Sequence, residues 1–277
     1  MSNFVMPPTG FGPGSQPLAE DDELQYTVMP QDMRTYSPHT PEIDDPTRVA
    51  AGTALMHDIA KSCADCAIDG QSRSHDLSHL DQANRAFMAD TLGEGEVSLR
   101  IRGIPAIRAQ ESFFAGVWLM AGEGVDRVEV APIPAIAIER AHTPHKPALL
   151  TAAPKPSTIA NAPALLAELM DKSASYQKGQ IPHVINLTLL PHTEGDLEWL
   201  DAALGEGAVT ILSRGYGNCR VTATALSKVW RVQFFNSMDT LILDTFEVTD
   251  MPEVALAADE DLRDSDARIR DVMETLA

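Results

Sequence analysis

One short sequence occurs twice in this chain, and its spacing constrains the fold more than any other feature. LGEGEVSL begins at Leu92 and LGEGAVTI begins at Leu204, so the two copies lie 112 residues apart (204 − 92). Trp118 and Trp230 keep the same offset. A repeat of 20–50 residues is typical of solenoids. This much longer period instead predicts two similar domains, for which a chain of 277 residues is long enough.

The residues around each copy predict a helix that ends at the repeated motif and a strand that follows it. Asp81 and Thr193 are candidate N-caps of these helices. Gly93 and Gly205 are expected to end them in the left-handed conformation, which glycine enters without a Cβ penalty. A phosphate-binding loop would need a strand before it, a helix after it and a Lys-Ser/Thr pair. The order here is reversed, so nucleotide binding is not expected.

The fold class expected from these patterns is α+β, with two tandem similar domains. Each domain is predicted to contain a helix, a short strand, a second helix and a three-stranded antiparallel meander. The predicted segments are a mostly disordered Pro/Gly-rich and acidic tail (1–45), the first α+β repeat (46–141), a Pro-rich linker (142–160), the second α+β repeat (161–258) and a C-terminal amphipathic helix (259–277).

Charge and composition narrow the classes of partner and the compartment. The formal net charge is −19, which repels nucleic acid and anionic lipid and attracts basic peptides. Acidity that only keeps the protein soluble is an equally good interpretation. We expect no export signal, because no Lys or Arg precedes Arg34, and no membrane span, because no apolar run is long enough. Three cysteines do not indicate a disulfide framework, so a cytoplasmic location is expected.

The cysteine pair is the sharpest candidate for chemistry in the sequence. Cys63 and Cys66, followed by His75 and His79, give the spacing C-x2-C-x8-H-x3-H, whose residue types serve in zinc sites. A redox dithiol is a second possibility. However, both cysteines lie on the apolar stripe of a predicted helix, where free cysteine behaves as a small hydrophobic residue. We therefore favour a packing role and expect no bound metal or other cofactor.

A glycine-flanked aromatic residue is the best candidate for partner contact. Gly215 and Gly217 suit the turn of a hairpin, with Tyr216 at its tip. Tyr216 would either project as an anchor for a partner or fold back onto the hairpin, and the sequence favours neither. The motifs HExxH, GxSxG and Walker A are all missing from the sequence. We therefore expect a protein that is not an enzyme.

Several spaced motifs together resemble the HupH/HyaF/HoxQ family of [NiFe]-hydrogenase maturation proteins. They are GFGPGSQP, LGEGEVS, INLTLLP, GYG, KVWRV and MPEVALAADEDLRDS, and they are densest from Ile185 to Ser265. The resemblance implies a cytoplasmic chaperone for the iron–sulfur small subunit of a membrane-bound hydrogenase. The chaperone would hold this subunit until its twin-arginine export. It also implies a thioredoxin-like accessory partner of the HyaE/HoxO/HupG type. It supplies no catalytic residues and no support for the cysteine pair.

Two functional hypotheses follow from the residues and the resemblance. The first is a non-enzymatic chaperone that binds the small-subunit precursor. Its expected contact residues are Tyr216 with its flanking glycines, and the N-terminal arm that contains Gly12 and Gly14. The second is a redox or metal-dependent factor that uses Cys63 and Cys66 to deliver or protect an iron–sulfur cluster.

Overall fold

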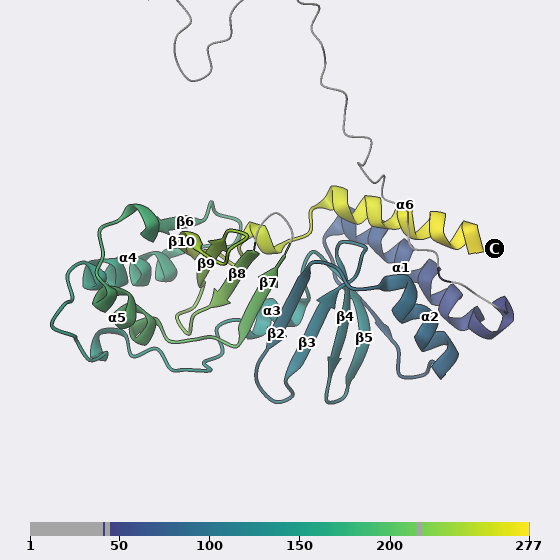
Figure 1. Cartoon of the computed structure of the whole chain (residues 1–277), viewed down its shortest axis with the longest axis horizontal. Helices are drawn as coiled ribbons and strands as arrows, with labels where there is room; N and C mark the ends of the chain where they lie inside the picture. Colours follow the sequence, from purple (N-terminus) through teal and green to yellow (C-terminus); the bar gives the residue numbers. More distant parts are fainter. Residues whose placement is uncertain (1–40, 42–44, 215–217, 277) are drawn as a thin grey trace, which may run out of the picture. The chain divides into compact units, whose positions relative to one another are not determined.

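The computed structural model describes residues 41, 45–214 and 218–276, and Figure 1 shows how their helices and strands are arranged. The α-helices in this part of the chain are α1 (Ala50–Asp69), α2 (Gln82–Leu92), α3 (Ala135–Arg140), α4 (Ala162–Ser175), α5 (Glu194–Leu204) and α6 (Asp259–Leu276). Short 3-10 helices are η1 (Pro46–Val49), η2 (Leu150–Ala152), η3 (Leu187–Leu189) and η4 (Glu253–Ala255).

All described strands belong to one antiparallel sheet. They are β1 (Arg73–Asp76), β2 (Val97–Ile101), β3 (Ile107–Glu111), β4 (Val117–Gly122), β5 (Val125–Val130), β6 (His183–Asn186), β7 (Val209–Ser213), β8 (Asn218–Ala223), β9 (Val229–Phe235) and β10 (Leu241–Val248). Their order across the sheet is β1-β5-β4-β3-β2-β7-β8-β9-β10-β6. The expected α+β class is confirmed.

The two halves of the chain meet in the middle of this sheet, where β2 pairs with β7. Leu99 lies opposite Ile211, which is its own counterpart at the offset of 112 residues. Likewise, Val97 lies opposite Ser213 and Ile101 opposite Val209, so the register is the same from either half. The two repeats therefore share a single sheet and do not form the two separate domains expected from the sequence.

Each half contains a four-stranded meander, so the expected three strands were wrong. The first half contains the additional strand β3, whose short sequence IRAQE is too polar to stand out. In the second half, CRVTATALSKVWRVQFF (219–235) is typical of a single β-rich run, but the structure divides it into β8 and β9. The turn between them has no glycine or proline, because Lys228 takes the positive φ of 64°. The corresponding residue of the first half is Gly116, with a φ of 76°.

The repeated glycines end α2 and α5, but their conformation differs from the expected left-handed one. Gly93 has φ 56° and ψ −162°, and Gly205 has φ 64° and ψ −166°. This combination belongs to a region that is essentially restricted to glycine. A Cβ atom at Gly93 would overlap the ring of Phe113, and one at Gly205 would overlap the backbone of Lys146. Both glycines are therefore required by backbone geometry and by space.

Helices cover both ends of one sheet face and leave its centre open. At one end, α1, α2 and α6 pack on β4 and β5 around Val117 and Val128. At the other end, α4 and α5 pack on β6 and β10 around Phe246. On the opposite face, α3 and the segment around Met251 and Ala255 pack over a core that includes Trp118 and Trp230. The centre of the first face, which is formed by β3, β2, β7 and β8, is not covered by any of the described helices.

Candidate functional site

The four candidate metal ligands do not assemble into one site. Cys63 and Cys66 are buried on α1, where burial raises the pKa of Cys63 to about 12 and also raises that of Cys66. His75 Nε2 lies 2.9 Å from Ser62 Oγ, and His79 is exposed. Within the described residues, no group of three or more His, Cys, Asp or Glu side chains is placed to hold a metal ion. The thiolate is the form that reacts and binds metals, so these neutral thiols are suited to packing.

The predicted partner residues lie outside the described part of the chain. These are Tyr216, Gly215 and Gly217 of the hairpin, and Gly12 and Gly14 of the N-terminal arm. Their role as contact residues remains a prediction.

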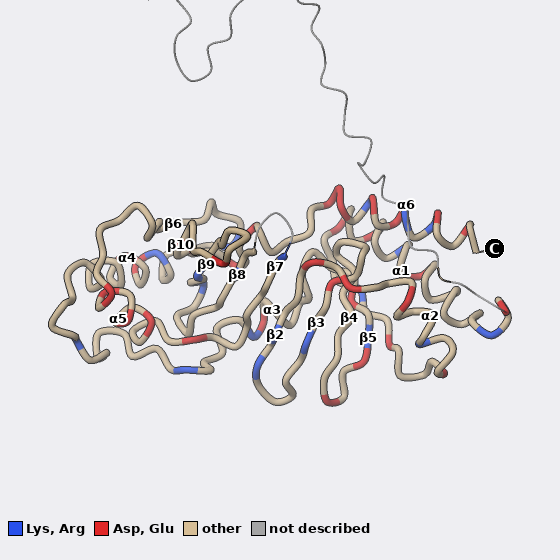
Figure 2. Tube along the Cα trace, in the orientation of Figure 1, with Lys and Arg blue, Asp and Glu red and all other residues tan. Residues whose placement is uncertain are grey.

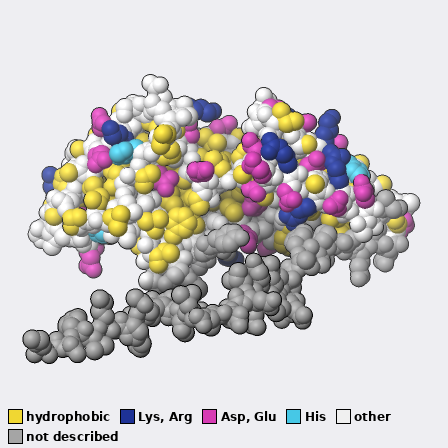
Figure 3. Space-filling view, turned by 90° about the horizontal axis from the view of Figure 1, so that it is seen from above, with side chains coloured by type: hydrophobic (Ala, Val, Ile, Leu, Met, Phe, Trp, Pro, Cys, Tyr) yellow, Lys and Arg dark blue, Asp and Glu magenta, His cyan; other side chains and the backbone are white. Residues whose placement is uncertain are grey.

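Apolar side chains are exposed on the turn between β9 and β10 and on the first residues of β10. We call Met238, Leu241 and Ile242 the apolar tip, and their exposed fractions are 79%, 45% and 56%. The tip is joined to the start of β8 because Asn218 Nδ2 donates to Asp239 Oδ1 at 3.0 Å. Figure 3 shows mostly hydrophobic and neutral side chains over this half of the protein, whereas charged side chains crowd the part over α6. Exposed apolar groups that lie together commonly mark interaction sites.

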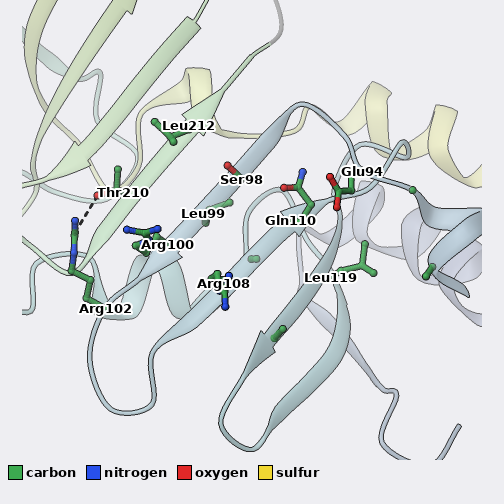
Figure 4. Close-up of a pocket in the computed structure, with 14 residues that line it drawn as sticks. Glu94, Ser98, Leu99, Arg100, Arg102, Arg108, Gln110, Leu119, Thr210 and Leu212 are labelled. Carbon is green, nitrogen blue, oxygen red and sulfur yellow. Dashed lines mark hydrogen bonds between the residues drawn. The ribbon is translucent and has the colours of Figure 1, made fainter. Parts of the chain in front are cut away.

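The open centre of the sheet forms a groove, which we call the central groove. Its cavity of about 590 Å³ is lined by side chains from β2, β3, β4 and β7 and by the end of α2. Residues directly opposite one another in an antiparallel sheet point to the same face. Ser98 therefore lies beside Gln110 on one side and Leu212 on the other, and Arg100 lies beside Arg108 and Thr210. Figure 4 shows these side chains together on one face of the sheet.

Arginine residues dominate the charge of the central groove. Arg100, Arg102 and Arg108 line the cavity, and Glu94 is its acidic lining residue. Arg102 is already paired, since Nη2 lies 3.0 Å from Glu206 Oε1 and Nη1 donates to Thr210 Oγ1. Arg100 and Arg108 are both exposed, and their guanidinium groups make no hydrogen bond or ion pair with any residue that the structure describes. Figure 2 shows blue Lys/Arg segments along β2 and β3.

The central groove was not predicted from the sequence, although the sequence contains a signal for it. Three arginines fall within nine residues, from Arg100 to Arg108, in a chain whose acidic residues outnumber its basic residues by 40 to 21. Alternation in RIRG places the first two arginines on one face of a strand. The partner strand β3 was not predicted, so its arginine could not be placed beside them.

Comparison with known proteins places the chain in a family. The model of the HupH hydrogenase expression protein, C-terminal conserved region, matches residues 49–143 and 159–276. The chain belongs to the HupH family. It is 59% identical over 276 residues to hydrogenase expression/formation protein HupH of Rhodobacter capsulatus, covering 100% of this chain and 99% of that protein. This confirms the family resemblance seen in the sequence.

More distant members of the HupH family also match along nearly their whole length. Hydrogenase expression/formation protein HoxQ of Cupriavidus necator is 42% identical over 286 residues, covering 99% of this chain and 98% of that protein. Hydrogenase-1 operon protein HyaF of Escherichia coli is 31% identical over 288 residues, covering 96% and 95%. A solved structure of HupH from Thiobacillus denitrificans is 30% identical, with a TM-score of 0.38, covering 42% of this chain and 95% of that one.

No helix in the part of this HupH family member that the structure describes is both long and apolar enough to span a membrane.

Proposed function

We propose that this protein is a non-enzymatic chaperone of [NiFe]-hydrogenase maturation, which binds the iron–sulfur small-subunit precursor in the cytoplasm before twin-arginine export. The observation that carries the proposal is similarity along the whole chain to proteins named for hydrogenase expression and formation. A thioredoxin-like accessory protein of the HyaE/HoxO/HupG type is a second expected partner. The proposal invokes no catalytic residues, and the activity that the structure has to explain is binding.

Net charge supports the first step of binding. A twin-arginine signal is basic near its start, and this chain carries a formal charge of −19. Attraction between them acts over roughly the Debye length, about 8 Å at physiological salt. Such steering raises the association rate more than it raises the final affinity. A long-lived complex therefore also requires apolar contacts.

The apolar tip supplies candidates for these contacts. Met238 lies on the exposed turn and Leu241 and Ile242 at the start of β10, and none of them has to leave the protein core to reach a partner. A side chain that becomes fully buried at an interface contributes up to about 2 kcal/mol to binding. We therefore assign the slow dissociation of the precursor to this tip together with the predicted anchor Tyr216.

Binding kinetics with the purified precursor test the proposal. Association should slow as salt rises for the full-length precursor, and much less for a precursor without its signal. Ile242→Ser should speed dissociation about tenfold. Ile181→Ser is the matched control, because Ile181 is 92% exposed and precedes β6 at the opposite end of the β6–β10 pair. If neither precursor binds while the hydrogenase large subunit does, the partner assignment is wrong.

The alternative function, a redox or metal-dependent factor, depends on the two cysteines. Their spacing of one helical turn is the observation in its favour, and their burial on α1 is the observation against it. Cys63→Ser combined with Cys66→Ser should leave hydrogenase maturation intact, because neutral buried thiols act as packing groups. A folded double variant that abolishes maturation, or bound metal in the purified protein, would establish the alternative instead.

We also infer that the two halves are copies of one unit. The same order of helix, strand, helix and four strands occurs in each, which supports the inference. The indole of Trp118 donates to Ala131 O at 3.0 Å, and that of Trp230 donates to Thr249 O at 3.2 Å. The two acceptors are 118 residues apart (249 − 131), as are the similar sequences EVAPIP at 129 and EVTDMP at 247, so the second half is six residues longer (118 − 112) between its tryptophan and this segment.

A further inference from the structure

We propose that the central groove binds an extended acidic segment of a partner polypeptide, with Arg100 and Arg108 as the groups that hold its carboxylates. This site is separate from the apolar tip and has the opposite charge preference from the rest of the chain. It does not depend on the identity of the hydrogenase precursor.

The first observation is the placement of two like charges side by side. Arg100 and Arg108 occupy directly opposite positions on β2 and β3. Like charges at such positions destabilise a sheet. Neither guanidinium has a partner in the described part of the chain, although acidic residues are abundant elsewhere. A carboxylate between them would remove the repulsion and accept hydrogen bonds from both planar groups.

The second observation is the composition of the surrounding surface. Leu119 and Leu212 give the groove an apolar surface, against which the aliphatic parts of the side chains of an extended peptide can pack. The opposing charges are few. Glu94 lines the groove without a partner among the described residues, whereas Glu206 is neutralised by Arg102 at 3.0 Å and Lys146 at 2.8 Å. Around Arg100 and Arg108, the cavity of about 590 Å³ therefore retains a local excess of positive charge.

The third observation is the length of the groove. A neighbouring hollow of about 680 Å³ shares Arg100, Arg102 and Arg108 with the cavity of about 590 Å³ and adds His145 and the acidic Glu123. The arginines thus stand where two hollows adjoin. Each hollow alone has the size of a pocket for a whole organic ligand, far larger than a single small anion requires. This extent favours several residues of an extended chain over free phosphate.

The net charge of −19 sets a further condition on such binding. At about 0.01 M salt the Debye length is about 30 Å, so the whole acidic protein repels an acidic peptide. At about 0.15 M salt that repulsion is screened, whereas contacts of about 3 Å with the arginines are screened much less. Affinity should therefore rise between these salt concentrations and fall again towards 1 M. A basic peptide should show only the fall.

Fluorescence anisotropy with the full-length protein tests the proposal. The probe is a labelled ten-residue peptide of alternating Glu and Ala, and its control replaces every Glu with Gln. At about 0.15 M salt we expect the Glu peptide to bind at least about tenfold more tightly than the Gln peptide. Arg100→Gln combined with Arg108→Gln should remove that difference. Arg48→Gln makes the same kind of substitution, with the loss of one positive charge, at an exposed site outside the groove and should leave the difference intact.

Four results would overturn the proposal. Equal affinity for the Glu and Gln peptides would exclude carboxylate recognition. Unchanged affinity in a double variant with a wild-type circular dichroism spectrum would place the binding elsewhere. Complete displacement of the peptide by 1 mM inorganic phosphate would assign the groove to a small anion. A dimer of the wild-type protein that dissociates in the double variant would make a second copy of the chain the occupant. No arm uses a hydrogenase precursor, so failure here leaves the proposed chaperone function untouched.

Discussion

Replacing the buried carboxylate of Asp196 should destabilise the second half of the protein strongly. This side chain joins the first turn of α5 to the start of α4. Its Oδ1 atom accepts backbone N–H groups of Ala160, Asn161 and Ala162 at 2.8, 3.0 and 3.0 Å. Its Oδ2 atom accepts the N–H and the hydroxyl of Thr193 at 2.9 and 3.1 Å. The negative charge also lies at the N-terminal ends of two helices, where it is favoured.

The magnitude follows from the donors that lose their acceptor. Asp196→Ala leaves four backbone N–H groups unpaired, each at a cost of about 1–3 kcal/mol. Water that enters the site and accepts hydrogen bonds from these groups reduces the total cost. We expect a loss of about 3–5 kcal/mol in the free energy of unfolding. Asp196→Asn keeps one oxygen but turns an NH₂ group towards the donors at the other position. We expect it to cost about 1–3 kcal/mol.

The pH dependence has a definite sign. Burial raises the pKa of Asp196, but the hydrogen bonds from Thr193, Ala162 and Ala160 outweigh burial and hold the pKa well below its usual range. A carboxyl whose pKa is depressed by folding stabilises the protein above its unfolded pKa, about 3.9, and this stability is lost as the pH falls. Between pH 7 and pH 3 the loss amounts to about 1.3 kcal/mol. The gap between wild type and Asp196→Asn should narrow by that amount.

Urea unfolding followed by tryptophan fluorescence measures these differences. Trp199 lies on the same helix and is buried, so it reports directly on this part of the core. Glu194→Gln removes the same charge from an exposed position in the first turn of α5 and should cost less than about 0.5 kcal/mol. The reasoning is refuted if Asp196→Asn is as stable as wild type at pH 7, or if its deficit is no smaller at pH 3.

Three further perturbations test other features. Arg108→Gln should raise the free energy of unfolding by about 0.2–0.5 kcal/mol, because it removes repulsion from Arg100; a drop above about 1 kcal/mol in a urea titration would contradict this. Gly205→Ala should lower the melting temperature through a loss of about 2–4 kcal/mol, because a Cβ atom there overlaps the backbone of Lys146; an unchanged melting temperature would contradict it. Burial raises the pKa of Glu111 to about 7, so folding stability falls as the pH rises from about 4.5 to about 7. Glu111→Gln should therefore stabilise the protein by about 1–3 kcal/mol at pH 8 and not at pH 4, which unfolding at the two pH values would check.

Local signals allowed several elements to be predicted from the sequence. The helix ends at Leu92 and Leu204 were visible because glycine follows each amphipathic pattern directly. Thr193 was identified as an N-cap from its residue type and position, and its hydroxyl accepts the backbone N–H of Asp196 as expected. The buried stripe of α6 was visible because its apolar spacing follows the helical period.

Non-local pairing decided what could not be predicted. The residues of β2 do not indicate that its neighbour in the sheet is β7, which lies more than a hundred positions away along the chain. The central groove exists only because of that pairing and because helices cover the sheet ends but not its middle. Lys228 illustrates a local limit of the same kind, since a positive φ of 64° at a lysine is imposed by surrounding structure rather than by its own preference.

The pairing of β2 with β7 gives the chain the architecture of a symmetric dimer whose subunits have been fused. In a true dimer of identical subunits, any substitution would appear twice, once on each side of the axis. Here each half can diverge alone. The core has kept its symmetry, with Trp118 and Trp230 in equivalent places. On the open face, the counterpart of Arg100 at the offset of 112 residues is Leu212. Fusion thus permits one polar, asymmetric recognition surface on a pseudosymmetric scaffold.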